Sequence, residues 1–201
     1  MKVHVDKNGI IVETDDFNLE HTLDCGQCFR FSMRPDGSSH GVAGNKPLTL
    51  RNMENGILFE NVSLEEFNSF WRVYFDLDRD YAEIRSQFPD HPALRNSTDF
   101  TYGVRILRQD AWEALISFII SQNNNVPRIK GIIDRLCRNF GEPVGQDYAF
   151  PSPAALAKLN VEDLGVIRCG FRAAYILDAA KKVNSGEIDL NEISKMPIVD
   201  A

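Results

Sequence analysis

The stretch SFIISQNNNVPRIKG, residues 117–131, joins two apolar segments through three consecutive asparagines and a proline. Asparagine is a poor residue inside a helix because its short amide competes for backbone hydrogen bonds. Pro127 has no N–H to donate and fits only the first turn of a helix, so a helix must begin near Asn125 or Val126. One asparagine then caps that helix. The stretch therefore predicts two helices separated by a tight turn.

Beyond the turn, apolar residues recur at the spacing of a core-facing helical stripe that ends at a glycine. The stripe comprises Ile129, Ile132, Ile133, Leu136, Cys137 and Phe140, and the glycine is Gly141. Most of the chain from residue 63 has helical signals of this kind. Expected helices cover residues 63–75, which open with a capping box from Ser63 to Glu66, and residues 80–88, 92–94, 111–122, 126–140, 153–159, 161–166, 171–183 and 190–196.

The first sixty residues alternate polar and apolar side chains, which is the pattern of strands. Two hairpins are expected around the Asn-Gly pairs at residues 8–9 and 55–56, and one further strand in QCFRFSM, residues 27–33. A small antiparallel sheet followed by helices gives an α+β fold class.

Net charge and length set broad limits on function. The 201 residues are 43% hydrophobic and 25% charged, as in an ordinary globular protein. Residues 1–100 hold 10 Lys and Arg against 17 Asp and Glu, whereas residues 101–201 hold 12 of each. The net charge of −7 therefore does not exclude a nucleic-acid partner for the second half. No signal peptide or membrane-spanning run is present, so we expect an intracellular protein, in the cytoplasm or nucleoid, or in the nucleus of a eukaryote.

The turn at residues 122–128 combines side-chain amides, the N–H groups that open a helix, and the cation Arg128. Such a corner suits an anion or the edge of a base. The alternative is a helix–helix turn in which the asparagines only cap helix ends.

Several segments together resemble one family. Residues 103–141, with LRQD and the NNN-x-x-R segment, resemble the central helices of the 8-oxoguanine DNA glycosylases in the helix-hairpin-helix superfamily. Residues 17–31 (G-Q-x-F-R core), 74–81 and 164–183 resemble further segments of that family. The resemblance implies an N-terminal antiparallel sheet domain of TBP-like fold over residues 1–103. It also implies an incomplete helical glycosylase domain over residues 104–201.

The resemblance also implies roles in base flipping on double-stranded DNA that contains oxidised guanine. Asn123, Arg128 and Arg172 would bind the cytosine left without its partner, and Phe171 would be a wedge in the base stack. The carbonyl of Gly26 would recognise the lesion. No cofactor or metal is implied, and we expect a monomer. Taken singly, each residue has a plain alternative: surface arginines, a core phenylalanine and a turn glycine.

Cys25 and Cys28 form a C-x-x-C pair, which can be a redox motif or half of a zinc site. No second pair follows, and His21 could supply only one more ligand. We expect buried, reduced thiols.

Residues 1–201 contain neither the G-V-G hairpin of the superfamily nor a lysine in the context of the family's nucleophile. Ala201 also follows Pro197 closely, where a helix would just be starting. We therefore expect a truncated chain that is inactive by itself, although the complete protein would be a DNA N-glycosylase and AP lyase. The alternatives are a non-catalytic module that binds DNA or lesions, and an alkyladenine-type glycosylase.

Overall fold

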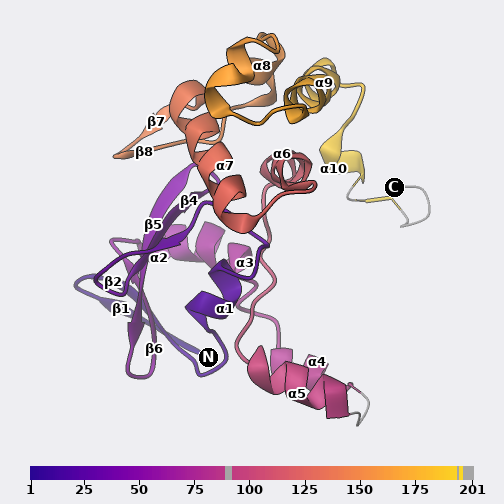
Figure 1. Cartoon of the computed structure of the whole chain (residues 1–201). Helices are drawn as coiled ribbons and strands as arrows, with labels where there is room; N and C mark the ends of the chain where they lie inside the picture. Colours follow the sequence, from indigo (N-terminus) through magenta and orange to yellow (C-terminus); the bar gives the residue numbers. More distant parts are fainter. Residues whose placement is uncertain (89–91, 194, 197–201) are drawn as a thin grey trace. The chain divides into compact units, whose positions relative to one another are not determined.

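The chain forms two compact units (Figure 1). The computed structural model describes residues 1–88, 92–193 and 195–196. Unit 1 comprises Met1–Gly41 and Leu48–Arg108, and unit 2 comprises Val42–Pro47 and Gln109–Ala201. The helix expected to start at Pro197 lies outside the described residues. No described helix combines the length and the apolarity that crossing a bilayer requires.

Unit 1 is built around a six-stranded antiparallel sheet with the strand order β1-β2-β6-β5-β4-β3. The strands are β1 (Lys2–Asp6), β2 (Gly9–Glu13), β3 (Ser32–Met33), β4 (Ser39–Ala43), β5 (Lys46–Met53) and β6 (Gly56–Glu60). The predicted sheet and the α+β class are confirmed. β4 was not predicted.

Both predicted hairpins are present, but each turn lies one residue earlier than expected. Asp6 pairs with Gly9 and Met53 pairs with Gly56, so each glycine opens the returning strand. A Cβ at Gly9 would stand 2.0 Å from the carbonyl oxygen of Phe59, which explains the glycine by close approach of the neighbouring strand.

The strand predicted over residues 27–33 is mostly wrong, because only Ser32–Met33 joins the sheet. The side chain of Gln27 explains the difference. It donates to the carbonyl oxygens of Thr22 and Arg105, both at 2.8 Å, and accepts from the N–H of Leu107 at 3.0 Å. Side-chain bonds hold this segment where a ladder of backbone bonds was expected.

Helical segments complete unit 1. Ser63 caps the predicted helix, which runs through α2 (Leu64–Glu66), a π-helical turn η1 (Phe67–Trp71) and α3 (Arg72–Tyr74). Its aromatic side chains pack on the sheet, and the ring centroids of Phe59 and Phe67 are 5.2 Å apart. The remaining helices are α1 (Leu19–Leu23), α4 (Tyr81–Ser86) and α5 (Pro92–Phe100).

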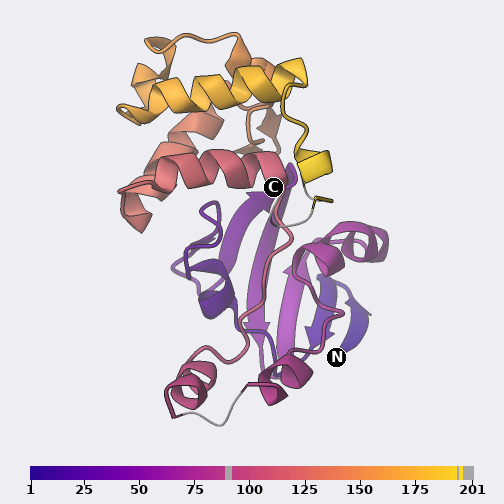
Figure 2. The same ribbon diagram turned by 90° about the vertical axis from the view of Figure 1, so that its right-hand side faces the viewer.

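Unit 2 is mainly helical, and its helix α6 contacts both α7 and α9 (Figure 2). Its elements are α6 (Ala111–Ser121), α7 (Val126–Phe140), β7 (Pro143–Val144), β8 (Asp147–Tyr148), α8 (Pro153–Ala157), a 3-10 helix η2 (Asp163–Ile167), α9 (Arg172–Ser185) and α10 (Leu190–Ile193). The predicted α7 matches at both ends. Its stripe is buried from Ile129 to Cys137, whereas Phe140 is only half-buried.

Candidate nucleic-acid interface

The three asparagines between α6 and α7 have different tasks. Asn124 donates its side-chain amide to the carbonyl of Ile120 at 3.0 Å, which satisfies a carbonyl in the last turn of α6. Asn125 is the N-cap of α7, and its Oδ1 accepts from the N–H of Arg128 at 3.0 Å. Asn123 has a left-handed backbone with φ of 48°. Its side chain is exposed and has no partner among the described residues. Of the three, Asn123 is therefore the one whose whole side-chain amide, both the oxygen and the NH₂ group, is available for a ligand in the described part of the chain.

Arg172 links this turn to the start of α9. Its side chain is buried, at 3% exposure. Nη2 donates to the carbonyl oxygens of Gln122 and Asn123, the latter at 3.1 Å, and Nη1 donates to the carbonyl of Cys169 at 3.3 Å. The Nε–H is buried without a partner in the described part of the chain. Arg172 is thus not the surface residue that the plain alternative supposed.

Phe171 precedes α9 and is 64% exposed, so it is not a core residue. The guanidinium of Arg172 lies 4.5 Å from its ring centroid. Tyr175, 61% exposed, meets it edge to face at 6.3 Å and 85°. An unburied aromatic pair of this kind can stack on bases. Tyr175 was not among the residues predicted for the site, although its i, i+4 spacing from Phe171 indicates that the two side chains are neighbours on α9.

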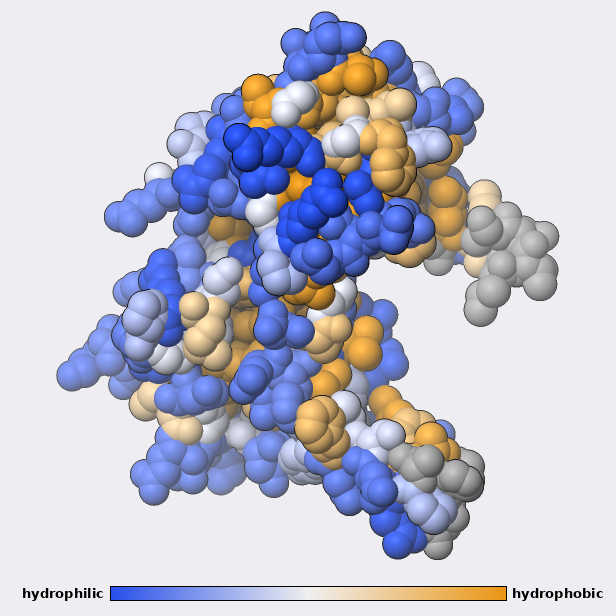
Figure 3. Space-filling model, viewed as in Figure 1, coloured by the Kyte–Doolittle hydropathy of each residue, from blue (hydrophilic) through white to orange (hydrophobic). Residues whose placement is uncertain are grey.

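Arg128 stands in the first turn of α7 with an exposed side chain that has no partner in the described part of the chain. Unit 2 has five arginines. Arg135 binds the carbonyl of Ile167 and Arg138 binds Asp134, so Arg128 and Arg168 are the two whose side chains have no described partner. Hydrophilic side chains cover much of the face of unit 2 that carries α7 (Figure 3).

Gly26 belongs to unit 1, in the loop after α1. Its φ of 89° disfavours other residues, and an added Cβ would meet no atom within 4 Å. The backbone therefore requires glycine while the space beside it stays open. Gln27, whose role the sequence did not indicate, fixes the loop through the three bonds described above. Gly26 thus belongs to a different unit from Asn123, which lies in unit 2.

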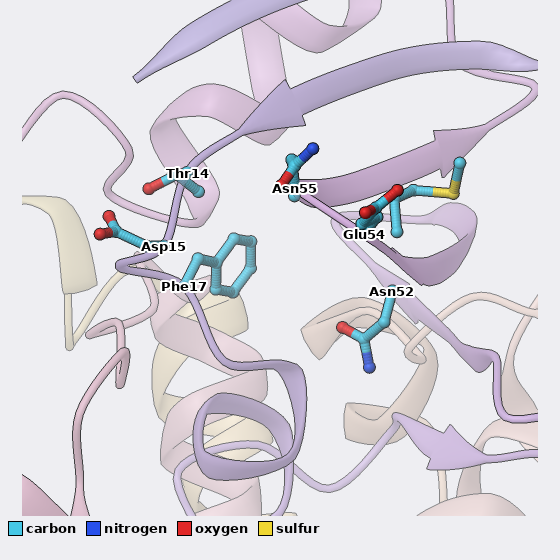
Figure 4. Close-up of a pocket in the computed structure, with 8 residues that line it drawn as sticks. Thr14, Asp15, Phe17, Asn52, Glu54 and Asn55 are labelled. Carbon is cyan, nitrogen blue, oxygen red and sulfur yellow. The ribbon is translucent and has the colours of Figure 1, made fainter.

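The predicted residues line neither of two cavities in unit 1, each of about 430 Å³. Figure 4 shows one of them, between the end of β2 and the β5–β6 turn. It is lined by Thr14, Asp15, Phe17, Asn52, Met53, Glu54, Asn55 and Gly56. Its ionisable groups are two carboxylates, which would repel a phosphate.

The cysteines differ from expectation at one position. Cys28, Cys137 and Cys169 are buried, but Cys25 is exposed. The thiols of Cys25 and Cys28 donate to the carbonyls of Thr22 and Leu23. Burial raises the pKa of the Cys169 thiol. Within the described ranges, no three His, Cys, Asp or Glu side chains converge as metal ligands.

Comparison with known proteins divides the chain between two family models. Residues 9–115 match the model of the 8-oxoguanine DNA glycosylase N-terminal domain, and residues 116–201 match that of the HhH-GPD superfamily base excision DNA repair protein. A Saccharomyces cerevisiae N-glycosylase/DNA lyase is 40% identical over 137 residues, which are 65% of this chain and 32% of the yeast protein. A Bacillus subtilis DNA-3-methyladenine glycosylase is 26% identical over 166 residues, 80% of this chain and 55% of that protein.

Among solved structures, the chain is similar to the Clostridium acetobutylicum 8-oxoguanine glycosylase/lyase in complex with duplex DNA containing cytosine opposite 8-oxoG. The TM-score is 0.90 at 37% identity, with 98% of this chain and 69% of that chain covered. The chain spans about a third of the length of the yeast protein and about half of the length of the Bacillus protein.

Proposed function

Because this chain belongs to the 8-oxoguanine DNA glycosylase family, we propose that it recognises 8-oxoguanine in duplex DNA and fills the space left when the damaged nucleotide is extruded. One observation carries the proposal. The Arg172 guanidinium binds the backbone carbonyl of Asn123, whose side-chain amide is available, and it also contacts the exposed Phe171 ring. Amide, cation and aromatic groups are the ones that an unpaired base requires.

The cytosine opposite the lesion would be bound by Asn123 and Arg128. Cytosine has both acceptors and an amino donor on its pairing edge, and an asparagine amide can supply both kinds of partner. Arg128 adds donors only, and they can meet the cytosine acceptors. The exposure of both side chains, neither with a described partner, supports these roles.

Arg172 would hold Asn123 in place for the same base. Its Nη groups donate to protein carbonyls, so we assign it chiefly a positioning role for Asn123. Three of its five N–H groups are thus used within the protein, and the direct contact with cytosine that the family resemblance implies would use the other two once the buried guanidinium becomes accessible.

Phe171 would enter the stack as a wedge, because an exposed apolar ring can partly unstack neighbouring bases. Gly26 would recognise the lesion through its carbonyl oxygen. 8-Oxoguanine carries a hydrogen on N7, whereas the N7 of guanine is an acceptor. A carbonyl oxygen at this position therefore accepts a bond from the lesion and repels guanine. The open space beside Gly26 supports this approach.

Base excision and strand cleavage are proposed for the whole protein, through a lysine that attacks the sugar C1′. We propose that the 201 residues alone bind DNA as a monomer and form no covalent intermediate. The test is incubation with an 8-oxoguanine·C duplex and borohydride. A trapped adduct would contradict the proposed inactivity, and absence of lesion-selective binding would contradict the proposed recognition.

A second candidate is supported by the similarity to the Bacillus subtilis DNA-3-methyladenine glycosylase. An alkyladenine-type site would prefer a duplex with a methylated purine. Competition between the two damaged duplexes for this chain distinguishes the two candidate functions. We expect the 8-oxoguanine duplex to bind more tightly. A purely DNA-binding module would show no preference between either damaged duplex and undamaged DNA.

A further inference from the structure

Two arginines clamp the short turn before α9. Arg135 donates from Nε to the carbonyl of Ile167 at 3.0 Å, and Arg172 donates to the carbonyl of Cys169 at 3.3 Å. Arg168 lies between these two carbonyls, and its own N–H donates to Gly165. Its backbone, with φ of 58° and ψ of 38°, is left-handed. The clamps therefore hold Arg168 in a conformation that it would rarely adopt by itself.

The left-handed region disfavours arginine because Cβ crowds the following carbonyl, and glycine would fit without that cost. Strained backbone of this kind is often found where a side chain has a function. The Arg168 side chain is exposed and has no hydrogen bond or ion pair in the described part of the chain. It is thus a cation on a rigid turn with no described intramolecular task.

Arg168 also lies close in sequence to the proposed wedge. The carbonyl of Cys169, the next residue, binds Arg172, which in turn contacts the Phe171 ring. We propose that Arg168 binds a DNA phosphate next to the step that Phe171 opens. This inference rests on the proposed function. A guanidinium donates two parallel hydrogen bonds to a phosphate, and the rigid turn lowers the entropy lost on binding.

A phosphate contact has a measurable signature. The slope of log K against log salt is negative, and loss of one phosphate contact makes it shallower by about 0.9. Binding then weakens about fivefold at 0.15 M salt. Phosphates carry no sequence information, so the loss should be equal for damaged and undamaged duplexes.

The experiment uses the 201-residue chain and two labelled duplexes, one with 8-oxoguanine·C and one with G·C. Fluorescence anisotropy gives the affinities between about 50 and 200 mM salt. Arg168→Gln removes the charge, Arg168→Gly removes the charge and the strain, and Arg168→Lys keeps both. Arg138→Ala is the matched control, because Arg138 is an exposed arginine of unit 2 already paired with Asp134.

We expect Arg168→Gln and Arg168→Gly to bind both duplexes about fivefold more weakly, with the salt dependence of binding reduced equally on both. Arg168→Lys should retain the wild-type salt dependence. Arg168→Gly should raise the unfolding midpoint by about 2 °C, which separates the affinity loss from unfolding. Wild-type slopes in Arg168→Gln and Arg168→Gly, with intact lesion preference, would overturn this inference alone. A wild-type chain without lesion preference would overturn the proposed function beneath it.

Discussion

Nη2 of Arg172 donates a 3.1 Å hydrogen bond to the carbonyl oxygen of Asn123, 49 positions away in the sequence. The same guanidinium binds Gln122 and Cys169, so one buried cation joins the α6–α7 turn to the turn before α9. Arginine suits this place because its planar fork presents several donors in fixed directions.

Replacing Arg172 should therefore cost stability. Arg172→Ala leaves these carbonyls without their charged donor, and we expect a loss of about 2–3 kcal/mol in the free energy of unfolding. Arg172→Lys should recover less than half of the lost free energy of unfolding, because one ammonium group cannot reproduce the several fixed donors of the guanidinium. Urea denaturation measures both variants. Wild-type stability in Arg172→Ala would show that the hydrogen bonds of Arg172 do not stabilise the fold.

Arg128→Ala should separate binding from folding. The side chain is exposed without a described partner, so the free energy of unfolding should change by less than about 0.5 kcal/mol. The preference for cytosine opposite the lesion should fall by about 1–3 kcal/mol. Competition among duplexes with each of the four opposite bases measures it. An equal loss against every base would contradict the assigned role.

The asparagines allow a matched comparison. Asn123→Gly keeps the left-handed backbone and should be nearly neutral for stability, whereas Asn123→Ala should lose about 1 kcal/mol. Both should lose the preference for cytosine. Asn125→Ala removes the N-cap of α7 and should lose about 1 kcal/mol while keeping the preference. Thermal unfolding and duplex competition give the two readouts. If only Asn125→Ala lost the preference for cytosine, the assignment of the base contact to Asn123 would be wrong.

Gly26→Ala tests the lesion contact. The added methyl meets no atom within 4 Å, so the cost is backbone strain of about 1–2 kcal/mol. We expect the ratio of affinities for 8-oxoguanine and guanine duplexes to fall, because the loop carbonyl moves. The control is Gly145→Ala, also at positive φ with open space but in unit 2. A similar fall in both variants would point to general destabilisation.

The thiols report on the fold without DNA. Cys25 is exposed and the other three cysteines are buried, so one thiol should react quickly with a thiol reagent at pH 8 and four should react in denaturant. Because burial raises the pKa of Cys169, its thiolate is scarcer at this pH and its reaction should accelerate only as the pH rises further. Cys25→Ser should abolish the fast phase. A second fast thiol would contradict the burial pattern.

Local sequence patterns predicted the elements whose causes are local. Pro127, Asn125 and Gly141 mark α7 at both ends because caps and proline act within one turn of the residues that they limit. The strand predicted over residues 27–33 failed because the partners of Gln27 lie at Thr22, Arg105 and Leu107, and alternation cannot indicate a distant hydrogen-bond partner.

The sequence by itself determined an α+β protein of this glycosylase family and the motifs that carry its candidate interface. The tertiary structure alone decided which asparagine keeps an available amide, that Arg172 is buried and binds backbone carbonyls, and that Arg168 is held in a left-handed turn. The physical reason is range. Capping and periodicity act over a few residues, whereas a buried guanidinium takes its acceptors from whichever turns the fold brings to it.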